Sequence, residues 1–327
     1  MLANFSVAGE LCDLVSNYVK LHSIHLPKLT PLLNKDYPDG RMPITDWWQA
    51  LELLREHTQL PHIGIELGKL AEPGHAGALG YLVQASASVA EALQAFQKYQ
   101  AILYEGAASS ATLDGDQIRI EWPLDYGYST RESDDTLTAG LVSFLRHATG
   151  QYELGPSAVG FVYDKPVDTQ PYRDCFGCDV KFGLNCTFMT FPVAYTQYPM
   201  LKADPMLNGI LKEKVEHQLA QRPQTEVFLR CFYQHLLLAM QAGEPTVETV
   251  ARRMLMSPRT LFRRLEERDL HFKDALLETR RQLAEQYLLE KRFSHSDIAE
   301  RLGYSEQSAF SRAFKSWTGQ TPSQFQK

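Results

Sequence analysis

The sequence lacks the segments that would carry a protein into or across a membrane. No stretch approaches about eighteen uncharged apolar residues, and the first apolar stretch contains Glu10 and Asp13 with no basic region before it. A transmembrane helix needs about 20 mostly apolar residues, and a secretory signal starts with basic ones. We therefore expect a cytoplasmic protein without a membrane partner.

Motifs for catalysis and cofactor binding are missing as well. The 10 histidines show no HExxH or paired spacing, and neither a phosphate-binding loop nor a GxGxxG pattern precedes a predicted helix. Such motifs place zinc ligands or backbone amides where metalloproteases and nucleotide-binding enzymes need them. Their absence argues against an enzyme, and we expect no cofactor and no metal site.

Charge is distributed unevenly along the 327 residues, a length that suffices for two globular domains. The net charge is −6, but from residue 223 onward 16 Lys and Arg outnumber 13 Asp and Glu, whereas the preceding residues contain 17 and 26. The helix-breaking stretch Gln221-Arg-Pro-Gln224 lies at this change. We predict an N-terminal domain over residues 1–200, a linker over 201–222, and a C-terminal domain over 223–327 whose positive field attracts phosphate.

The C-terminal part contains two helix-turn-helix patterns, Val247 to Glu267 and Ser296 to Thr318, joined by one uninterrupted amphipathic helix, Phe272 to Glu290. In the first pattern, four apolar residues bracket a tight turn over residues 255–257: Val250, Leu255, Leu261 and Leu265. In the second, spacings of four and three place three aromatic core residues on one helix face: Phe310, Phe314 and Trp317. Ser257 and Ser305 are the predicted N-caps of the second helices.

The opposite faces of these second helices are polar and suit DNA. Arginine can bind guanine through two hydrogen bonds, glutamine suits adenine, and hydroxyls reach bases or phosphates. The candidate DNA-binding residues are Arg259, Thr260, Arg263, Gln307, Ser308, Ser311 and Arg312. A single helix of this kind could be an ordinary solvated surface, but two copies with the same layout favour double-stranded DNA as the partner.

A set of specific stretches covers the region from residue 223 onward. They are Ser257-Pro-Arg-Thr-Leu-Phe-Arg-Arg-Leu265, Arg280 with Ala284 and Leu288, Ile298-Ala-Glu-Arg-Leu-Gly-Tyr-Ser305, Ser308-Ala-Phe-Ser-Arg-Ala-Phe-Lys-Ser-Trp-Thr-Gly319 and Thr321-Pro322. This set resembles the AraC/XylS family of bacterial transcription regulators. The resemblance implies that one monomer lays two recognition helices into successive major grooves, about 34 Å apart. It also implies a homodimer that acts on promoter DNA together with RNA polymerase.

Three residues depart from the family pattern. Gln326 stands where an arginine usually ends the chain's last motif, and His295 where an aliphatic residue is common. Phe262 occupies a position that is often polar and contacts DNA, so we expect it either to pack inward or to touch a thymine methyl group.

Residues 1–200 alternate between helical and strand patterns. Helices are predicted over Val7 to His22, Asp46 to Thr58, Ile63 to Ala71, Val89 to Leu103 and Asp134 to Ala148. Strands are predicted over Ser110 to Leu113, Gln117 to Trp122, Ala158 to Tyr163 and Thr187 to Phe191, with a hairpin signal at Asp114-Gly115. The predicted fold class is an α/β N-terminal domain with a small antiparallel sheet, followed by an all-α C-terminal domain with two helix-turn-helix motifs and a long connecting helix.

Two N-terminal stretches, Gly77-Ala-Leu-Gly-Tyr-Leu82 with Glu91-Ala-Leu93, and Cys175-Phe-Gly-Cys-Asp-Val-Lys-Phe182, resemble the arabinose-binding or dimerisation domain that accompanies some of these regulators. The resemblance implies a small-molecule effector, although no residue pattern favours a sugar. Aromatic side chains with polar ends often line ligand pockets, and the candidates are Tyr81, Trp122 and Tyr126. The alternative is that these three are ordinary core residues.

Two features leave alternatives open. Cys175 and Cys178, with Cys186 after them, have spacing that suits a redox or zinc site, so a redox- or metal-responsive regulator is the alternative hypothesis, although a fourth ligand is not in evidence. The predicted helix Asp204 to Gln221 has one apolar stripe. That stripe either packs on its own domain or pairs with its copy in a second subunit.

Overall fold

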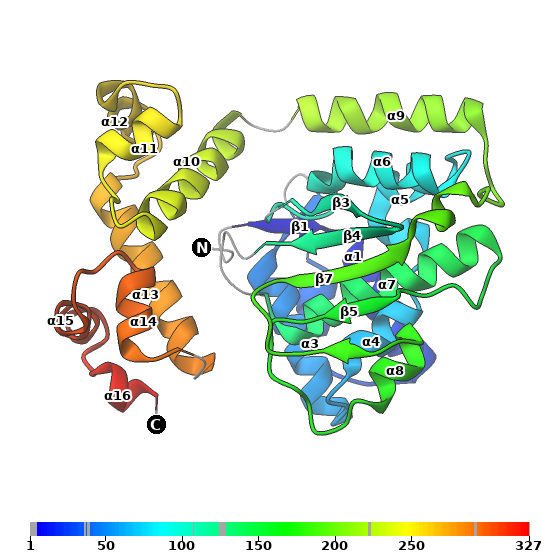
Figure 1. Cartoon of the computed structure of the whole chain (residues 1–327), viewed down its shortest axis with the longest axis horizontal. Coiled ribbons are helices and arrows are strands. Elements are labelled where there is room, and N and C mark those ends of the chain that lie inside the picture. The colour runs from blue at the N-terminus through cyan, green and yellow to red at the C-terminus, as the bar shows by residue number, and fades with distance from the viewer. Residues whose placement is uncertain are drawn as a thin grey trace. The chain divides into compact units, whose positions relative to one another are not determined.

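Figure 1 shows a computed structural model of the chain, which describes residues 5–35, 37, 40–106, 108–123, 129–221, 224–290 and 293–326. The described residues divide into two compact units, one ending at residue 221 and the other beginning at residue 224. The first mixes helices with two small sheets, and the second is helical throughout its described elements. This confirms the predicted fold class.

The larger sheet of the N-terminal unit has the strand order β3-β4-β7-β5-β6. Its strands are β3 (Ser110–Asp114), β4 (Gln117–Trp122), β5 (Ala158–Gly160), β6 (Val180–Lys181) and β7 (Thr187–Pro192). Neighbours are antiparallel, except that β5 and β6 are parallel. The predicted β3–β4 hairpin is present, and its Gly115 has a φ of 59°, which glycine adopts without steric cost. A separate antiparallel pair consists of β1 (Ser6–Ala8) and β2 (Arg41–Pro43).

Helices make up most of the remaining N-terminal unit. They are α1 (Leu11–Leu21), α2 (Thr30–Leu33), α3 (Ile44–Thr58), α4 (Ile63–Lys69), α5 (Gly77–Gln84), α6 (Val89–Tyr99), α7 (Arg131–Thr149), α8 (Gln170–Phe176) and α9 (Pro205–Ala220), with short 3-10 helices η3 (Pro73–Ala76), η4 (Gln100–Ile102) and η5 (Val193–Gln197). Two predicted boundaries are wrong. Val7 lies in β1, because it pairs with Met42, and the predicted strand from Ala158 ends at Gly160.

Helices α4 and α7 approach closely because α4 presents glycines to α7. An ideal Cβ on Gly68 would lie 2.5 Å from Ala139 Cβ, and one on Gly64 would lie 2.6 Å from Asp135 Cβ. Both distances are shorter than real contacts between carbon atoms, so neither glycine can gain a methyl group without a shift of α7.

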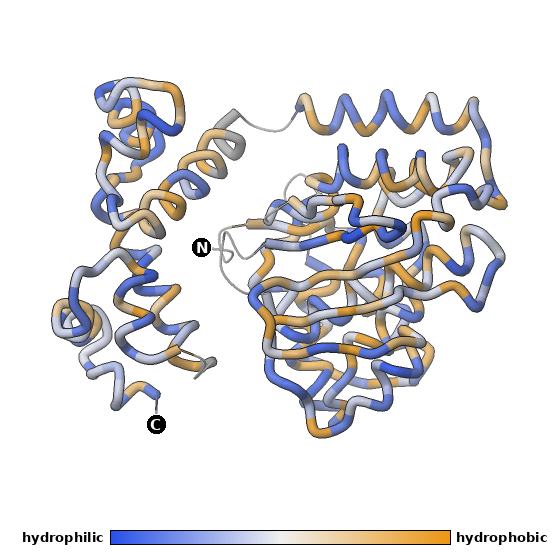
Figure 2. Tube along the Cα trace, viewed as in Figure 1, coloured by the Kyte–Doolittle hydropathy of each residue, from blue (hydrophilic) through white to orange (hydrophobic). Residues whose placement is uncertain are grey.

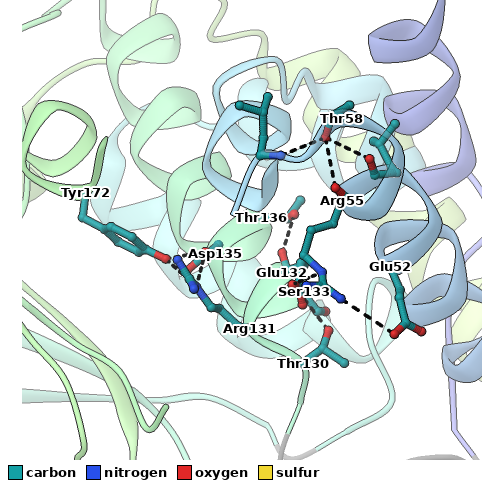
Figure 3. A network of polar contacts seen from close by, with 12 residues as sticks. Glu52, Arg55, Thr58, Thr130, Arg131, Glu132, Ser133, Asp135, Thr136 and Tyr172 are labelled. Atoms are coloured by element: carbon teal, nitrogen blue, oxygen red, sulfur yellow. Dashed lines mark hydrogen bonds and ion pairs between the residues drawn. The ribbon is translucent and has the colours of Figure 1, made fainter. Parts of the chain in front are cut away.

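A polar network surrounds the first turns of α7 (Figure 3). The buried Asp135 carboxylate accepts hydrogen bonds from Tyr172 Oη at 2.7 Å and from Tyr163 Oη, and Arg131 Nε lies 3.7 Å away. Burial raises the pKa of Asp135 to about 7, although the two hydroxyls and the guanidinium oppose the shift. Glu132, in the same turn, pairs with Arg55 of α3 at 3.0 Å.

The C-terminal unit consists of helices in the order that the two motifs require. They are α10 (Gln224–Gln241), α11 (Val247–Arg253), α12 (Pro258–Glu266), α13 (Phe272–Glu290), α14 (His295–Arg301), α15 (Gln307–Thr318) and α16 (Pro322–Phe325). With 19 residues and a rise of about 1.5 Å each, α13 spans roughly 28 Å between the two motifs.

Candidate nucleic-acid interface

The first helix-turn-helix consists of α11 and α12. The Ser257 hydroxyl accepts a hydrogen bond from the Thr260 backbone N–H at 3.1 Å and caps α12 as predicted, with Pro258 in its first turn. Val250, Leu261 and Leu265 are buried. Leu255 lies in the turn as predicted, with a φ of 55°, and its side chain is 95% exposed.

The outward face of α12 carries the three predicted side chains. Arg259 is exposed, and Arg263 is exposed with a weak ion pair to Glu267 at 3.7 Å. Thr260 is half-buried, and its Oγ1 lies 2.8 Å from the Ser257 hydroxyl. Thr260 therefore also takes part in the cap, whereas the two arginines extend into solvent.

The second helix-turn-helix consists of α14 and α15. Ser294 and Asp297 form a reciprocal capping box at the start of α14. The prediction that Ser305 caps α15 is wrong, because the helix starts one residue later and Glu306 occupies the cap position without a capping hydrogen bond. Instead, the Glu306 carboxylate accepts a hydrogen bond from the Ser308 hydroxyl at 3.0 Å.

Aromatic packing holds the second motif together. Phe310 and Phe314 are fully buried, with ring centroids 5.8 Å apart. Trp317 was predicted to be a core residue, but it is only half-buried, because it lies at the margin of this cluster against the rings of Tyr304 and Phe314. The outward face of α15 presents exposed Gln307, Ser308 and Arg312 and half-buried Ser311.

The long helix α13 is tied to the turn of the second motif through Arg280. Its Nε donates to the Leu302 carbonyl oxygen at 3.0 Å and its Nη2 to that of Gly303 at 3.4 Å, while its guanidinium lies 4.5 Å from the centre of the Tyr304 ring. Gly303 has a φ of 71°, and an ideal Cβ there would lie 3.2 Å from the Met240 carbonyl oxygen of α10. The turn before α15 is therefore fixed by α13 on one side and by α10 on another.

Two of the three unusual residues meet. His295 Nε2 lies 3.1 Å from Gln326 Oε1, so the residue at the start of α14 is hydrogen-bonded to the end of the last motif. Phe262 is 45% exposed on α12 and does not pack fully inward. The sequence marks His295, Gln326 and Phe262 only as separate departures from the family pattern. It contains no signal that His295 and Gln326 are in contact.

The structure does not bring the predicted ligand residues together. Tyr81 is exposed on α5 and lines a cleft between α1, α5 and α9. Trp122 is half-buried at the end of β4, packs against the core around Phe161 and does not line that cleft. Tyr126 lies outside the described residues.

The cysteine pair forms the end of a short helix. Cys175 is the penultimate residue of α8, and Gly177, with a φ of 70°, terminates that helix before Cys178. Burial raises the pKa of both thiols to about 11, so both stay protonated at neutral pH and react slowly as thiolates. Among the residues that the structure describes, no group of three His, Cys, Asp or Glu side chains could hold a metal ion.

An α/β unit followed by two capped helix-turn-helix motifs on one rigid helix defines a two-domain DNA-binding transcription regulator. Residues 29–200 match the family described as the arabinose-binding domain of AraC transcription regulators, N-terminal, and residues 250–327 match a helix-turn-helix domain family. The chain belongs to the AraC family of transcription regulators. Within the described ranges, no helix is both long and apolar enough to cross a membrane.

Relatives match along most of the chain. The ornithine utilization regulator of Pseudomonas aeruginosa is 29% identical over 294 residues, covering 89% of this chain and 86% of that protein. The regulator VirS of Mycobacterium tuberculosis is 27% identical over 296 residues, covering 88% and 85%. The crystal structure of the regulator CdpR from Pseudomonas aeruginosa aligns over 96% of each chain with 21% identity and a TM-score of 0.46.

Proposed function

We propose that α12 and α15 are the two recognition helices and that their outward side chains read promoter DNA. The observation that carries this proposal is that each helix turns a polar face to solvent while its opposite face is locked into a core by Leu261 and Leu265 or by Phe310 and Phe314. Arg259 and Arg312 form no ion pair with any residue that the structure describes, so their donors are available to bases. The remaining proposed contacts are Thr260, Arg263, Gln307, Ser308 and Ser311.

Arg312→Ala tests this proposal. If Arg312 binds a base edge, the variant loses about 1 to 3 kcal/mol of specific binding free energy and relaxes the preference at one base pair. A binding site is selected from a random DNA library with the unaltered protein, and affinities are then measured by titration at one salt concentration. Arg281→Ala is the charge-matched control, because Arg281 is held on α13 by Glu278 and Glu285 at 2.6 and 3.0 Å. Equal losses on every DNA sequence would instead identify Arg312 as a phosphate contact.

The regulator is proposed to act in the cytoplasm as a homodimer through its N-terminal unit, together with RNA polymerase. Hydrophobic and hydrophilic residues alternate along α9 (Figure 2). Its apolar residues differ in burial along the helix. Val215 is fully buried against the α5 and α6 cluster, whereas Met206, Leu207 and Ile210 near the start of the helix are exposed. Exposed apolar residues on one helix end suit pairing with a second copy.

An effector completes the proposal. The N-terminal unit belongs to a family named for arabinose binding, and one relative is named for ornithine utilization, so the effector is proposed to be a small metabolite. The test is a titration of promoter DNA with the full-length protein in the presence of sugars and of amino acids. An affinity that no compound changes would contradict this part of the proposal.

A further inference from the structure

A cleft of about 550 Å³ lies in the N-terminal unit among α1, the segment from η3 to α5, and α9. Its lining includes Glu10, Asp13 and Asn17 around the start of α1, Tyr81 on α5, and Lys214 on α9. Pockets for small ligands have volumes of about 300 to 1,000 Å³. The cleft therefore has room for a metabolite of a few carbon atoms with its bound waters.

The charges in this cleft are unbalanced. Glu10, Asp13 and Lys214 are all exposed, and none forms an ion pair or side-chain hydrogen bond with a residue that the structure describes. Two carboxylates therefore face the cleft from α1 and one ammonium group faces it from α9.

The floor of the cleft is polar but uncharged. His75 is 7% exposed, and its Nδ1 accepts a hydrogen bond from the Glu72 backbone N–H at 2.9 Å, so the neutral ring carries its proton on Nε2. That nitrogen lies 3.0 Å from the side-chain amide group of Asn17, and its N–H donates to the Asn17 amide oxygen when the amide is oriented with Oδ1 toward the ring. Burial lowers the pKa of His75, which keeps the ring neutral at physiological pH. The histidine thus fixes Asn17 without cancelling the charge of the two carboxylates.

Two glycines keep the functional groups in place. Gly77 has a φ of 56°, and an ideal Cβ on it would lie 2.7 Å from Glu10 Oε1. An ideal Cβ on Gly74 would lie 3.1 Å from the Tyr81 hydroxyl. Any side chain at residue 77 would displace the Glu10 carboxylate, so the bare backbone here accommodates that group.

We propose that this cleft binds a dibasic amino acid, a molecule with two ammonium groups and one carboxylate. Two ammonium groups on the ligand match Glu10 and Asp13, and its carboxylate matches Lys214, so every charge acquires a partner of opposite sign. Ala78 and Leu211 supply apolar surface for the methylene chain. A neutral sugar would leave all three charges unpaired. The inference rests on the proposed effector response and assigns a place and a chemical class to that effector.

The site would also connect the ligand to the rest of the chain. Lys214 and Leu211 belong to α9, which ends at Ala220, shortly before the C-terminal unit begins at residue 224. A ligand held by α1 and α9 together ties the last helix of the N-terminal unit to the body of that unit.

Calorimetric titration of the full-length protein tests the site, with L-ornithine and L-lysine as ligands. Norvaline lacks the second ammonium group, the diamine putrescine lacks the carboxylate, and arabinose lacks both. We expect binding of the two dibasic amino acids and at least about tenfold weaker binding of the other three. Equal affinity for norvaline or arabinose would overturn the proposal.

Variants locate the site. Glu10→Gln and Asp13→Asn should each weaken ornithine binding at least about tenfold, and Lys214→Gln should remove the preference for ornithine over putrescine. Lys212→Gln and Glu213→Gln are matched controls on α9, because both residues are exposed and neither lines the cleft. Thermal melts check that all variants fold. Unchanged ornithine binding in the α1 variants would overturn the site.

The effector proposal is judged separately by DNA affinity. If another compound changes promoter binding equally in the unaltered protein and in Asp13→Asn, an effector exists and the cleft assignment is wrong. If ornithine binds the cleft but DNA affinity stays constant with every compound, the binding site stands and the regulatory role is wrong.

Discussion

At the scale of single residues, Asp135 has a carboxyl group buried in the N-terminal unit. Its carboxylate is 1% exposed and contacts Tyr172 and Arg131 (Figure 3). Tyr163 Oη donates a further hydrogen bond to it. Asp134 beside it also has its pKa raised to about 7, mainly by burial. A free carboxylic acid has a pKa near 3.9, so the folded protein binds protons here that the unfolded chain releases.

The stabilisation that Asp134 and Asp135 contribute to the N-terminal unit should be complete below about pH 4, the pKa of a carboxyl group in the unfolded chain. It should be lost as the pH rises to about 7. Between pH 5.5 and pH 8 we expect the free energy of unfolding to fall by about 2 kcal/mol for each of the two groups. Urea titrations followed by tryptophan fluorescence measure this, because Trp47, Trp48 and Trp122 lie in this unit. Asp135→Asn should reduce the pH dependence to about half, because Asp134 still titrates, and an unaltered slope in that variant would contradict the assignment.

Trp317 lies at the edge of the core of the C-terminal unit and not at its centre. Because its side chain is half-buried at the margin of the aromatic cluster, Trp317→Ala should cost about 2 to 4 kcal/mol of folding free energy, less than Phe314→Ala at the fully buried centre. Thermal unfolding of the two variants gives the comparison. If Trp317→Ala kept full thermal stability and lost only DNA binding, the residue would belong to the interface.

At the scale of elements, the close packing of α4 against α7 depends on missing side chains. Gly68→Ala should destabilise the unit by about 1 to 3 kcal/mol, because the added methyl would lie 2.5 Å from Ala139 Cβ. Gly209→Ala in α9 is the matched control: no atom lies within 4 Å of its ideal Cβ, so the change should stabilise the helix by roughly 0.5 to 1 kcal/mol. Denaturant titrations of both variants measure the two effects. Equal changes in the free energy of unfolding for the two variants would contradict the role of packing at Gly68.

Local periodicity predicted the longer elements well. The helix predicted from Asp46 to Thr58 is α3, which starts two residues earlier, and Phe272 to Glu290 is α13 with the predicted ends. The short strands β1, β2 and β6 were not predicted, because they depend on partners far along the chain. The same limit applies to the site: helix periodicity identified the polar faces of α12 and α15, but the contacts of Arg280 with the Gly303 turn arise only from tertiary packing.

At the scale of the whole molecule, our proposal assigns DNA reading to the C-terminal unit and dimerisation to the N-terminal unit. A fragment beginning at residue 223 should fold alone, remain monomeric and bind one half-site. The full-length dimer should bind a two-half-site promoter about 10² to 10⁴ times more tightly, because the second contact becomes intramolecular. Titrations at one salt concentration with sedimentation measure both properties.

Ile210→Glu in the full-length protein, compared with Lys212→Glu on the same helix, tests the proposed interface. The first variant should sediment as a monomer and bind DNA as weakly as the fragment. A fragment that dimerises by itself would move the interface into the C-terminal unit.

The contact between His295 and Gln326 matters for anyone who exchanges segments between regulators of this family. The two residues lie 31 positions apart in the sequence, yet they share one hydrogen bond. Grafting the terminal segment of a relative, with its usual arginine, onto this protein would replace the amide oxygen that accepts from His295 Nε2–H by a guanidinium, which only donates, so the histidine would have to move its proton to Nδ1. Residues 295 and 326 are therefore best exchanged together in a chimeric regulator.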